Sequence, residues 1–421
     1  MNYFIFSNSF KRGLQIAVIL LLCVAALGNS VAYAAGLCVH PTGAGKCFTS
    51  IQAAVDAAHD GDWIAIRPGR YIEQVTIIGK DLTLIGRSGV VIQAPAGMQD
   101  TLSLVAGVEG RPIILVSDAN VTLRDLTIDG VNSAENNPFL EGVVFINADG
   151  VIRNNLVRNT GFGAPTLPII NGEPSYQGEG MLVVNFMPTP RSVTIAENRV
   201  MNYNSSGVTV FAQADPNDPT HANLTVHVVD NTVIGSGPND VIAQWGIFFG
   251  GYDFADPQFS ITGTLKGNRV RDQVTVAGYP IPGVGIATFS TSNVAMTDNV
   301  IDNVNIGLAA HQAFSARIQD NQFMGLGQAV SGSAGILLSG SNAQVLENRF
   351  KKLETGILLL VDDFAFGSAL NTALDENRFD NVAVDVLTSP GASPSMAMAN
   401  TTSLQPSSAW QRNRLFHQPL K

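Results

Sequence analysis

The stretch 299–321, NVIDNVNIGLAAHQAFSARIQDN, begins and ends on an Asn that follows an Asp, and Gly307 lies between them. A four-residue element recurs along the chain: an acid, Asn, any residue and an apolar residue, with Gly267 in place of the acid once. The Asn residues of successive elements are 33, 37, 31, 22, 27 and 29 residues apart. The recurring residues are Asn198, Asn231, Asn268, Asn299, Asn321, Asn348 and Asn377, with Gly207, Gly246, Gly285, Gly307, Gly335 and Gly356 between them. This recurrence predicts a repeat protein whose shortest unit is 22 residues long.

Each unit holds three short runs of β-forming residues separated by turns. Three strands in about 22 residues predict one coil of a parallel β-helix, in which each strand pairs with its counterpart about 4.8 Å away in the next coil. The predicted fold is therefore all-β, a solenoid of three-strand coils. At one corner we expect Asn to adopt left-handed backbone angles and to bond amide to amide along the stack.

An acid precedes most of the repeat Asn residues, and stacked coils would place these acids in one column. Arg residues two positions further on can offset the repulsion, which favours a structural charge ladder over a metal site. The acids are Glu197, Asp230, Asp298, Asp320, Glu347 and Glu376, and the basic residues are Arg199, Arg269, Arg349 and Arg378.

The N-terminal part differs from the repeat. Ile51, Ala54, Val55 and Ala58 form one apolar stripe behind Thr49 and Ser50, which can cap a helix, and this predicts a short helix that caps the coil. Cys38 and Cys47, nine residues apart, are expected to form a disulfide if the protein is exported.

The opening helix with Pro68-Gly69-Arg70-Tyr71-Ile72-Glu73, together with the Gly…Asn coil repeat, resembles the pectin lyase-like superfamily of right-handed parallel β-helices. The resemblance covers nearly all of the chain after residue 34 and implies a right-handed coil. It does not define an activity, because the superfamily includes lyases, esterases, glycosidases, epimerases and non-catalytic surface proteins.

The first 34 residues are typical of a secretory signal peptide. Lys11 and Arg12 precede an apolar run, 16–27, that is too short for a bilayer, and Ala32-Tyr33-Ala34 offers a cleavage site. We therefore expect a monomer that is secreted, periplasmic or on the cell surface, with no membrane insertion in its mature form. The predicted segments are 1–34, signal peptide; 35–62, disulfide loop and capping helix; 63–388, β-helix; and 389–421, a low-complexity tail and C-terminal segment.

The composition excludes some partners. Charged side chains make up 14% of the chain, the net charge is -10, and no basic stripe is present, which argues against nucleic acid. A hydrophobic fraction of 45% supports a large core.

In the resembling enzymes the site lies on the outer face of one sheet, so the residues two and four past each repeat Gly are predicted to be outward. These two columns contain one His and no carboxylate, which disfavours a lyase or glycosidase site there. An apolar column of this kind is expected to be covered or to bind something. The first column is Thr209, Phe248, Ala287, Ala309, Leu337 and Leu358, and the second is Phe211, Gly250, Phe289, His311, Ser339 and Leu360.

Three insertions after these strands, 213–221, 250–258 and 362–368, carry Asp and aromatic residues. They predict either a loop-lined cleft, in which rings stack on sugars and carboxylates bind Ca²⁺ or transfer protons, or polar turns that shield the sheet. The candidate catalytic residues are His311, Asp253 and Asp363, and the candidate binding residues are Tyr252, Phe254, Asp256, Asp215 and Phe364. No metal ligand is assigned, and Ca²⁺ is the one cofactor considered.

Two short matches to pectinesterase motifs, at Asp100 and Asp363, lie 263 residues apart and are interpreted as coincidental. Two hypotheses follow. The first is an exported β-helix that binds an extracellular or cell-wall polysaccharide and, if it is an enzyme, acts on it as a lyase, esterase or hydrolase. The alternative is a non-catalytic surface, structural or adhesion protein.

Overall fold

The computed structural model describes residues 36–105, 108–133, 139–161, 169–170, 173–174, 178–212, 224–238, 242–251, 261–276, 282–325, 332–360, 372–389, 395–396 and 401–403. The chain divides after Ala34 into two units, and all of these residues belong to the second.

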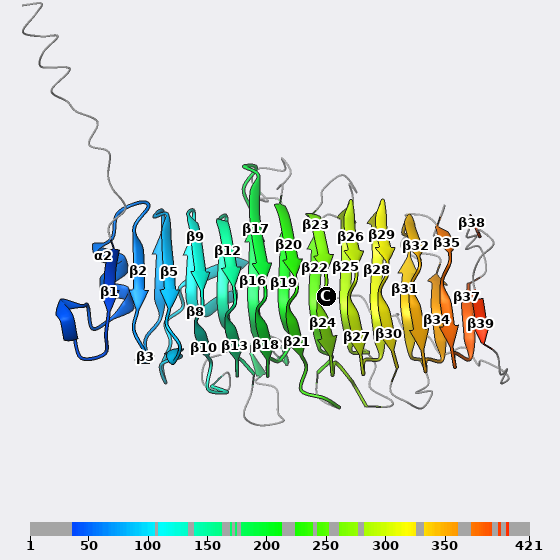
Figure 1. Cartoon of the computed structure of the whole chain (residues 1–421), viewed down its shortest axis with the longest axis horizontal. Helices are drawn as coiled ribbons and strands as arrows, with labels where there is room; N and C mark the ends of the chain where they lie inside the picture. The colour runs from blue at the N-terminus through cyan, green and yellow to red at the C-terminus, as the bar shows by residue number, and fades with distance from the viewer. Residues whose placement is uncertain are drawn as a thin grey trace, which may run out of the picture. The chain divides into compact units, whose positions relative to one another are not determined.

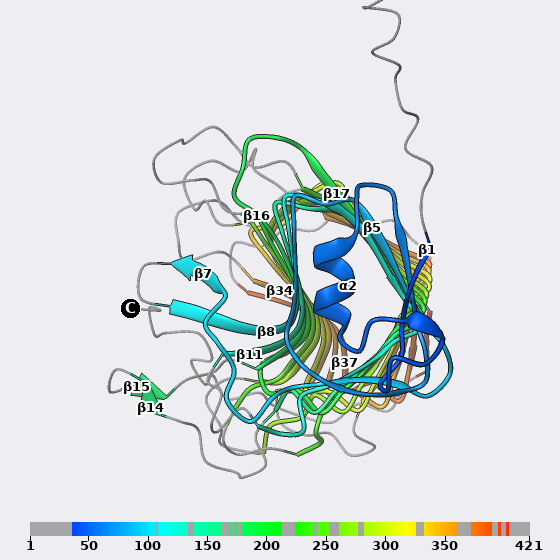
Figure 2. The ribbon, with the colours of Figure 1, turned by 90° about the vertical axis from the view of Figure 1, so that its left-hand side faces the viewer.

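The described chain winds repeatedly through three parallel sheets, here named A, B and C, with one strand of each coil in each sheet (Figures 1 and 2). Sheet C contributes the longer strands and sheet B the shortest. The predicted all-β parallel β-helix is confirmed, and the three sheets are consistent with the right-handed coil that the resemblance implies. Strands of successive coils pair in register along the whole stack, as the repeat predicted.

Sheet A consists of β1 (Gly36–Val39), β2 (Trp63–Ile66), β5 (Leu82–Gly86), β9 (Asn120–Arg124), β12 (Asp149–Arg153), β17 (Arg191–Ala196), β20 (Leu224–Val229), β23 (Ile261–Lys266), β26 (Val294–Thr297), β29 (Ala316–Gln319), β32 (Ala343–Leu346), β35 (Ala373–Asp375) and β38 (Ser395–Met396). Sheet B consists of β3 (Gly69–Ile72), β6 (Val90–Gln93), β10 (Thr127–Asp129), β13 (Leu156–Arg158), β18 (Arg199–Met201), β21 (Thr232–Ile234), β24 (Arg269–Arg271), β27 (Val300–Asp302), β30 (Gln322–Met324), β33 (Arg349–Lys351), β36 (Arg378–Asp380) and β39 (Thr401–Ser403).

Sheet C consists of β4 (Val75–Ile78), β8 (Val108–Ser117), β11 (Leu140–Ile146), β16 (Glu179–Asn185), β19 (Ser206–Ala212), β22 (Trp245–Gly251), β25 (Val284–Ser292), β28 (Ile306–Phe314), β31 (Ala334–Ser339), β34 (Thr355–Leu360) and β37 (Val384–Thr388). The strand β7 (Leu102–Val105) pairs antiparallel with β8, and β14 (Ile169–Ile170) pairs antiparallel with β15 (Glu173–Pro174). Parallel pairing extends beyond the predicted range 63–388, because β1 joins β2 and because β38 and β39 continue sheets A and B.

The helix α2 (Ile51–Ala57) lies inside the outline of the coil when the stack is viewed from its first strands (Figure 2). Ser50 caps it by accepting a hydrogen bond from the Ala53 amide. The Glu73 carboxylate accepts bonds from the amides of Ile51 and Gln52, at 2.9 and 3.0 Å. The helix buries its apolar face, as the stripe predicted.

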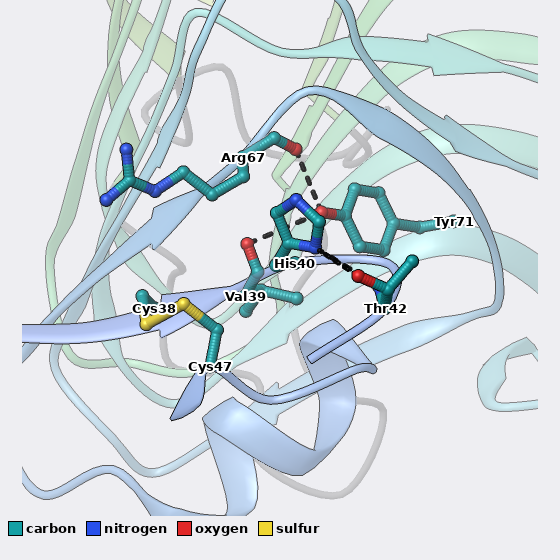
Figure 3. The surroundings of a disulfide bond; sticks show 7 residues. All are labelled: Cys38, Val39, His40, Thr42, Cys47, Arg67 and Tyr71. Carbon is teal, nitrogen blue, oxygen red and sulfur yellow. Dashed lines mark hydrogen bonds between the residues drawn. A yellow bond between two sulfur atoms is a disulfide. The ribbon is translucent and has the colours of Figure 1, made fainter. Parts of the chain in front are cut away.

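The predicted disulfide between Cys38 and Cys47 is present, with the two Cα atoms 4.8 Å apart (Figure 3). It joins β1 to the segment after the short 3-10 turn η1 (Ala44–Lys46). The Tyr71 hydroxyl donates to the Arg67 carbonyl oxygen at 2.8 Å beside it. The disulfide therefore links β1 to the loop that follows it, and the Tyr71 hydrogen bond links β3 to the turn that precedes it.

Asn residues form a continuous ladder at the corner between sheets A and B, which confirms the predicted amide bonding. Asn268 is typical: its Nδ2 donates to the Val228 carbonyl at 2.8 Å and to Asn299 Oδ1 at 3.0 Å, and its Oδ1 accepts from the Asn231 amide at 3.0 Å. The ladder also includes Asn155, one coil before the predicted series. Each of these amides is almost completely buried.

The left-handed backbone angles at this corner belong to the residue before each Asn, so the prediction that Asn adopts them was wrong. Glu197 has φ 56°, Asp298 has φ 58° and Glu347 has φ 58°. Gly267, with φ 67°, takes the same place where the acid is missing. Glycine is the residue that tolerates this conformation best, which explains why it can replace an acid here. The cations paired with this column are Arg153, with Glu197, and Lys266, with Asp298, which differ from the predicted Arg residues.

The repeat glycines form a second ladder, at the start of each sheet C strand. A Cβ on Gly246 would lie 2.5 Å from the Gly285 carbonyl oxygen, and one on Gly285 would lie 2.7 Å from that of Gly307. Gly142 and Gly180 show the same contacts and extend the series by two coils. A side chain is excluded at these positions because successive coils approach too closely for one.

The predicted alternation along sheet C is also confirmed. Residues one and three past each glycine, such as Val208 and Val210, belong to the continuous core inside the coil. Residues two past it, such as Phe248 and Leu337, belong to separate apolar clusters on the outer face.

Candidate outer-face site on sheet C

The outer face of sheet C carries two apolar clusters even though it lies outside the coil. The first is centred on β8, β11 and β16 and contains Leu102, Leu115, Val144, Leu182 and Val184. The second is centred on β22 to β31 and contains Phe248, Val284, Ala287, Ile306 and Leu337. Phe211 packs against both clusters, so the apolar strip is continuous across the middle coils.

Aromatic rings gather where the two clusters meet. The Trp245 and Phe248 ring centroids are 4.6 Å apart, those of Phe211 and Phe248 5.3 Å, and those of Phe248 and Phe289 5.5 Å. The ring of His311 follows on the next strand, with its centroid 5.5 Å from that of Phe289. These five rings, contributed by four neighbouring strands, are named the ring cluster below.

Two glutamates occupy the position before the repeat glycine on the same face, two and three strands from Trp245 in the sheet. Glu141 on β11 and Glu179 on β16 are register partners, and Ser206 and Trp245 occupy the same position in the next coils. Glu141 is 2% exposed, and its Oε2 accepts a hydrogen bond from the Arg111 amide at 2.9 Å. The Arg111 guanidinium forms an ion pair with Asp100.

Burial shifts the ionisation of both carboxyl groups. It raises the pKa of Glu179 to about 7, although the Thr209 side chain offsets part of the effect. The pKa of Glu141 is raised well above its usual value, first by burial and then by the charge of Glu179. The pair therefore retains a proton into the neutral pH range.

Several buried polar atoms on this face have no hydrogen-bond partner within the part of the chain that the structure describes. They are Glu179 Oε2, Ser205 Oγ, Thr209 Oγ1 and Trp245 Nε1. Buried polar groups are nearly always paired, because an unmet donor or acceptor costs about 1–3 kcal/mol. This group of atoms is available to a ligand that has hydroxyl groups.

Of the residues that the sequence nominated, the structure places His311 on the predicted outer column, in contact with the Phe289 ring. Asp253, Asp363, Tyr252, Phe254, Asp256, Asp215 and Phe364 lie outside the described residues. Among the residues that are described, no group of three or more His, Cys, Asp or Glu is arranged to hold a metal ion. No described helix has the length and apolar character needed to span a membrane.

The glutamate pair was missed by the sequence analysis, although the two predicted columns themselves do contain no carboxylate. Those columns start at Gly207 and include only the positions after the glycine. The signal is present in the sequence: Glu141-Gly142 and Glu179-Gly180 repeat the same dipeptide 38 residues apart, each before an apolar strand.

Comparison with known proteins adds evidence on the fold. No protein-family model matches the chain, and no curated protein matches it. A lacto-N-biosidase from Eubacterium ramulus has a similar structure, with a TM-score of 0.57 and 11% identity, covering 88% of this chain and 68% of the other. PfbA, a surface adhesin of Streptococcus pneumoniae, has a TM-score of 0.53 and 10% identity, covering 84% and 86%.

The Dettilon tailspike protein has a TM-score of 0.50 and 13% identity, covering 83% of this chain and 63% of the other. At such identities the likeness concerns the fold alone. The three structures place this chain in the class of parallel β-helix proteins, which agrees with the sheet topology.

Proposed function

We propose that this protein binds an extracellular or cell-wall polysaccharide on the outer face of sheet C. The observation that carries the proposal is the ring cluster next to the buried glutamate pair. Binding sites for organic ligands are lined mainly by apolar and aromatic side chains with a few placed polar groups, and this face has that composition. The rings of Phe211, Phe289 and His311 are half-buried, so part of the ring cluster is accessible to a ligand.

The fold neighbours support such a role without deciding its chemistry. A lacto-N-biosidase and a surface adhesin share the fold, so it accommodates both an enzyme named for a sugar substrate and an adhesin. Export is part of the proposal: the segment 1–34 is a signal peptide, and the disulfide fits an oxidising location. The helix α2 acts as the N-terminal cap of the coil, shielding the apolar residues of the first turn.

The proposal is tested by affinity electrophoresis of the mature protein in gels that contain extracellular polysaccharides. Phe289→Ala and His311→Ala each remove a half-buried ring from the cluster. Each is expected to weaken retention about tenfold, since one ring contact contributes about 1 kcal/mol. Arg349→Ala, on the exposed outer side of sheet B, is the control and should leave retention unchanged. Equal retention of wild type and both ring variants would refute the assignment of this face.

A second candidate function is a non-catalytic adhesin, which the fold likeness to PfbA favours. Turnover separates the two. The products to be assayed are reducing ends, unsaturated sugars and methanol, with Ca²⁺ present. Product formation that Glu179→Gln abolishes would establish an enzyme, whereas binding with all three assays blank would establish the adhesin.

A further inference from the structure

We infer that the glycan bound on this face is uncharged, and that Glu179, Thr209 and Trp245 bind its hydroxyl groups. This inference rests on the proposed function, because it names the class of ligand for the same face. The inference predicts that the face binds neutral polysaccharides and does not bind polysaccharides built of uronic acids.

The strand register brings the three side chains to one part of the face. Glu179 is on β16, Thr209 is on the adjacent β19, and Trp245 is on β22, which follows β19. Thr209 pairs directly with Phe248 in the register, so it lies beside the ring cluster. The three residues therefore come from three consecutive strands of sheet C.

The hydrogen-bonding atoms of these side chains match a sugar. Thr209 is only 1% exposed, and its hydroxyl lies close enough to the Glu179 carboxyl to lower that group's pKa; beyond this contact it has no partner among the described residues, nor have Glu179 Oε2 and Trp245 Nε1. A carboxylate oxygen accepts, an indole N–H donates, and a hydroxyl does both. A sugar hydroxyl can donate to the first, accept from the second and do either with the third. Water would satisfy the same atoms in the free protein.

The charges of the site oppose an acidic sugar. Glu141 and Glu179 already bring two carboxyl groups into a buried position, and a uronate would add a third anion that needs a cation. Arg111 is the permanently charged cation in the strands of sheet C, and its guanidinium is paired with Asp100; the other basic side chain there is the imidazole of His311 on β28.

The ionisation of the pair agrees with this assignment. Burial raises the pKa of Glu179 to about 7 and keeps that of Glu141 well above its usual range. Among the described charged groups, Glu179 itself is the one that raises the pKa of Glu141 electrostatically, and the Arg111 amide acts in the opposite direction. A neutral ligand causes no further repulsion in either protonation state.

The experiment compares two panels of polysaccharides by affinity electrophoresis of the mature protein. The neutral panel is galactan, xyloglucan and β-glucan, and the acidic panel is polygalacturonate and alginate, each with Ca²⁺ or with EDTA. We expect retention by at least one neutral polysaccharide, unchanged by EDTA, and none by the acidic panel. Retention by a uronate, including Ca²⁺-dependent retention, would overturn the inference and leave the proposed function standing. No retention in either panel would refute both.

Three variants then test the named side chains on the retaining neutral polysaccharide: Glu179→Gln, Thr209→Val and Trp245→Phe. Each keeps the size or the ring of the original residue and removes one hydrogen-bonding function. Each should weaken binding about five- to tenfold. Glu197→Gln, an exposed glutamate paired with Arg153, is the matched control and should bind as wild type does.

Thermal unfolding of each variant shows whether it is folded. If Glu179→Gln does not fold, Trp245→Phe still tests the assignment, because it keeps an aromatic ring at this position and removes the Nε1 donor. Unchanged affinity in the folded variants would overturn the assignment of these three residues.

Discussion

Two regions of the coil differ in whether their buried polar groups have hydrogen-bond partners. At the corner between sheets A and B, the Asn ladder pairs its amides from one coil to the next; Asn299, for example, donates to Leu265 and to Asn321. On the outer face of sheet C, Glu179, Thr209 and Trp245 leave buried atoms without partners among the described residues. The ladder repeats along the stack and is buried, whereas the three outer-face side chains come from three consecutive strands, and Glu179 and Trp245 are only half-buried.

This difference indicates that the two regions have different roles. A fully paired ladder stabilises the stack, because buried hydrogen bonds are strong when every member is satisfied. Unpaired buried atoms and carboxyl groups with raised pKa values do not stabilise the stack in this way, and at Glu179 both occur together on the face where we propose binding. Substitutions in the two regions should therefore affect different measurements.

The largest effect is expected in the ladder. Asn268→Ala removes the acceptor of the Asn231 backbone amide, the amide donor to the Val228 carbonyl, and one of the bonds of the Asn231 side chain, which keeps those to Ile195 and Val229. At about 1–3 kcal/mol for each buried group, the free energy of unfolding should fall by about 4 kcal/mol. Urea unfolding followed by circular dichroism measures the loss.

Asn342→Ala is the control for this variant, because Asn342 is exposed and outside the ladder. It should change stability by less than about 0.5 kcal/mol. Similar losses in the free energy of unfolding of both variants would show that the ladder contributes no more to stability than an exposed Asn does. Neither substitution is expected to change polysaccharide affinity at equal folded fraction.

A smaller effect, with a distinct pH dependence, is expected on the sheet C face. The pKa of Glu179 is about 7 in the folded protein against an ordinary value of 4.5, so the folded state binds the proton more tightly. The contribution of Glu179 to stability is therefore largest below about pH 4.5, falls as the pH rises toward 7, and levels off above it. The total fall is at most about 3 kcal/mol, and less where water reaches the partly exposed side chain.

Glu179→Gln should abolish the part of this slope that belongs to Glu179. Urea midpoints at pH values from 5 to 8 measure it in wild type and variant. Glu197→Gln, in which an exposed carboxylate is changed, should keep the wild-type slope. An identical slope in wild type and Glu179→Gln would contradict the raised pKa.

Much of the fold could be predicted from the sequence because its constraints are local and repeat. Gly285 is required by the close approach of the next coil, and Asn268 is required by the amide bonds along the corner. Because these constraints recur, the same residue type recurs at each position from coil to coil. The disulfide was predictable from the nine-residue spacing of Cys38 and Cys47. The period of two then placed the outward columns correctly.

The candidate site was harder to predict, because it depends on contacts between coils of unequal length. Glu141 and Glu179 meet only after a 38-residue unit has folded back into register, and nothing in their immediate sequence marks them as buried. Likewise, periodicity could locate the corner but not decide which of two adjacent residues takes the left-handed angle. Backbone geometry assigns it to Glu347 and not to Asn348.

That left-handed corner provides the smallest predicted effect. Glu347 has φ 58°, a conformation that costs a residue with a Cβ about 1 kcal/mol, and Gly267 occupies the same place in another coil. Glu347→Gly should therefore stabilise the protein by about 0.5 kcal/mol after the greater freedom of glycine in the unfolded chain is included. The hydrogen bond from Gln319 is exposed and long, at 3.4 Å, so its loss adds little. The reciprocal Gly267→Glu should lower the unfolding midpoint, and the two shifts are compared by thermal unfolding. If Glu347→Gly instead lowers the midpoint, the carboxylate itself stabilises the corner, and the charge ladder contributes more than the backbone angle costs.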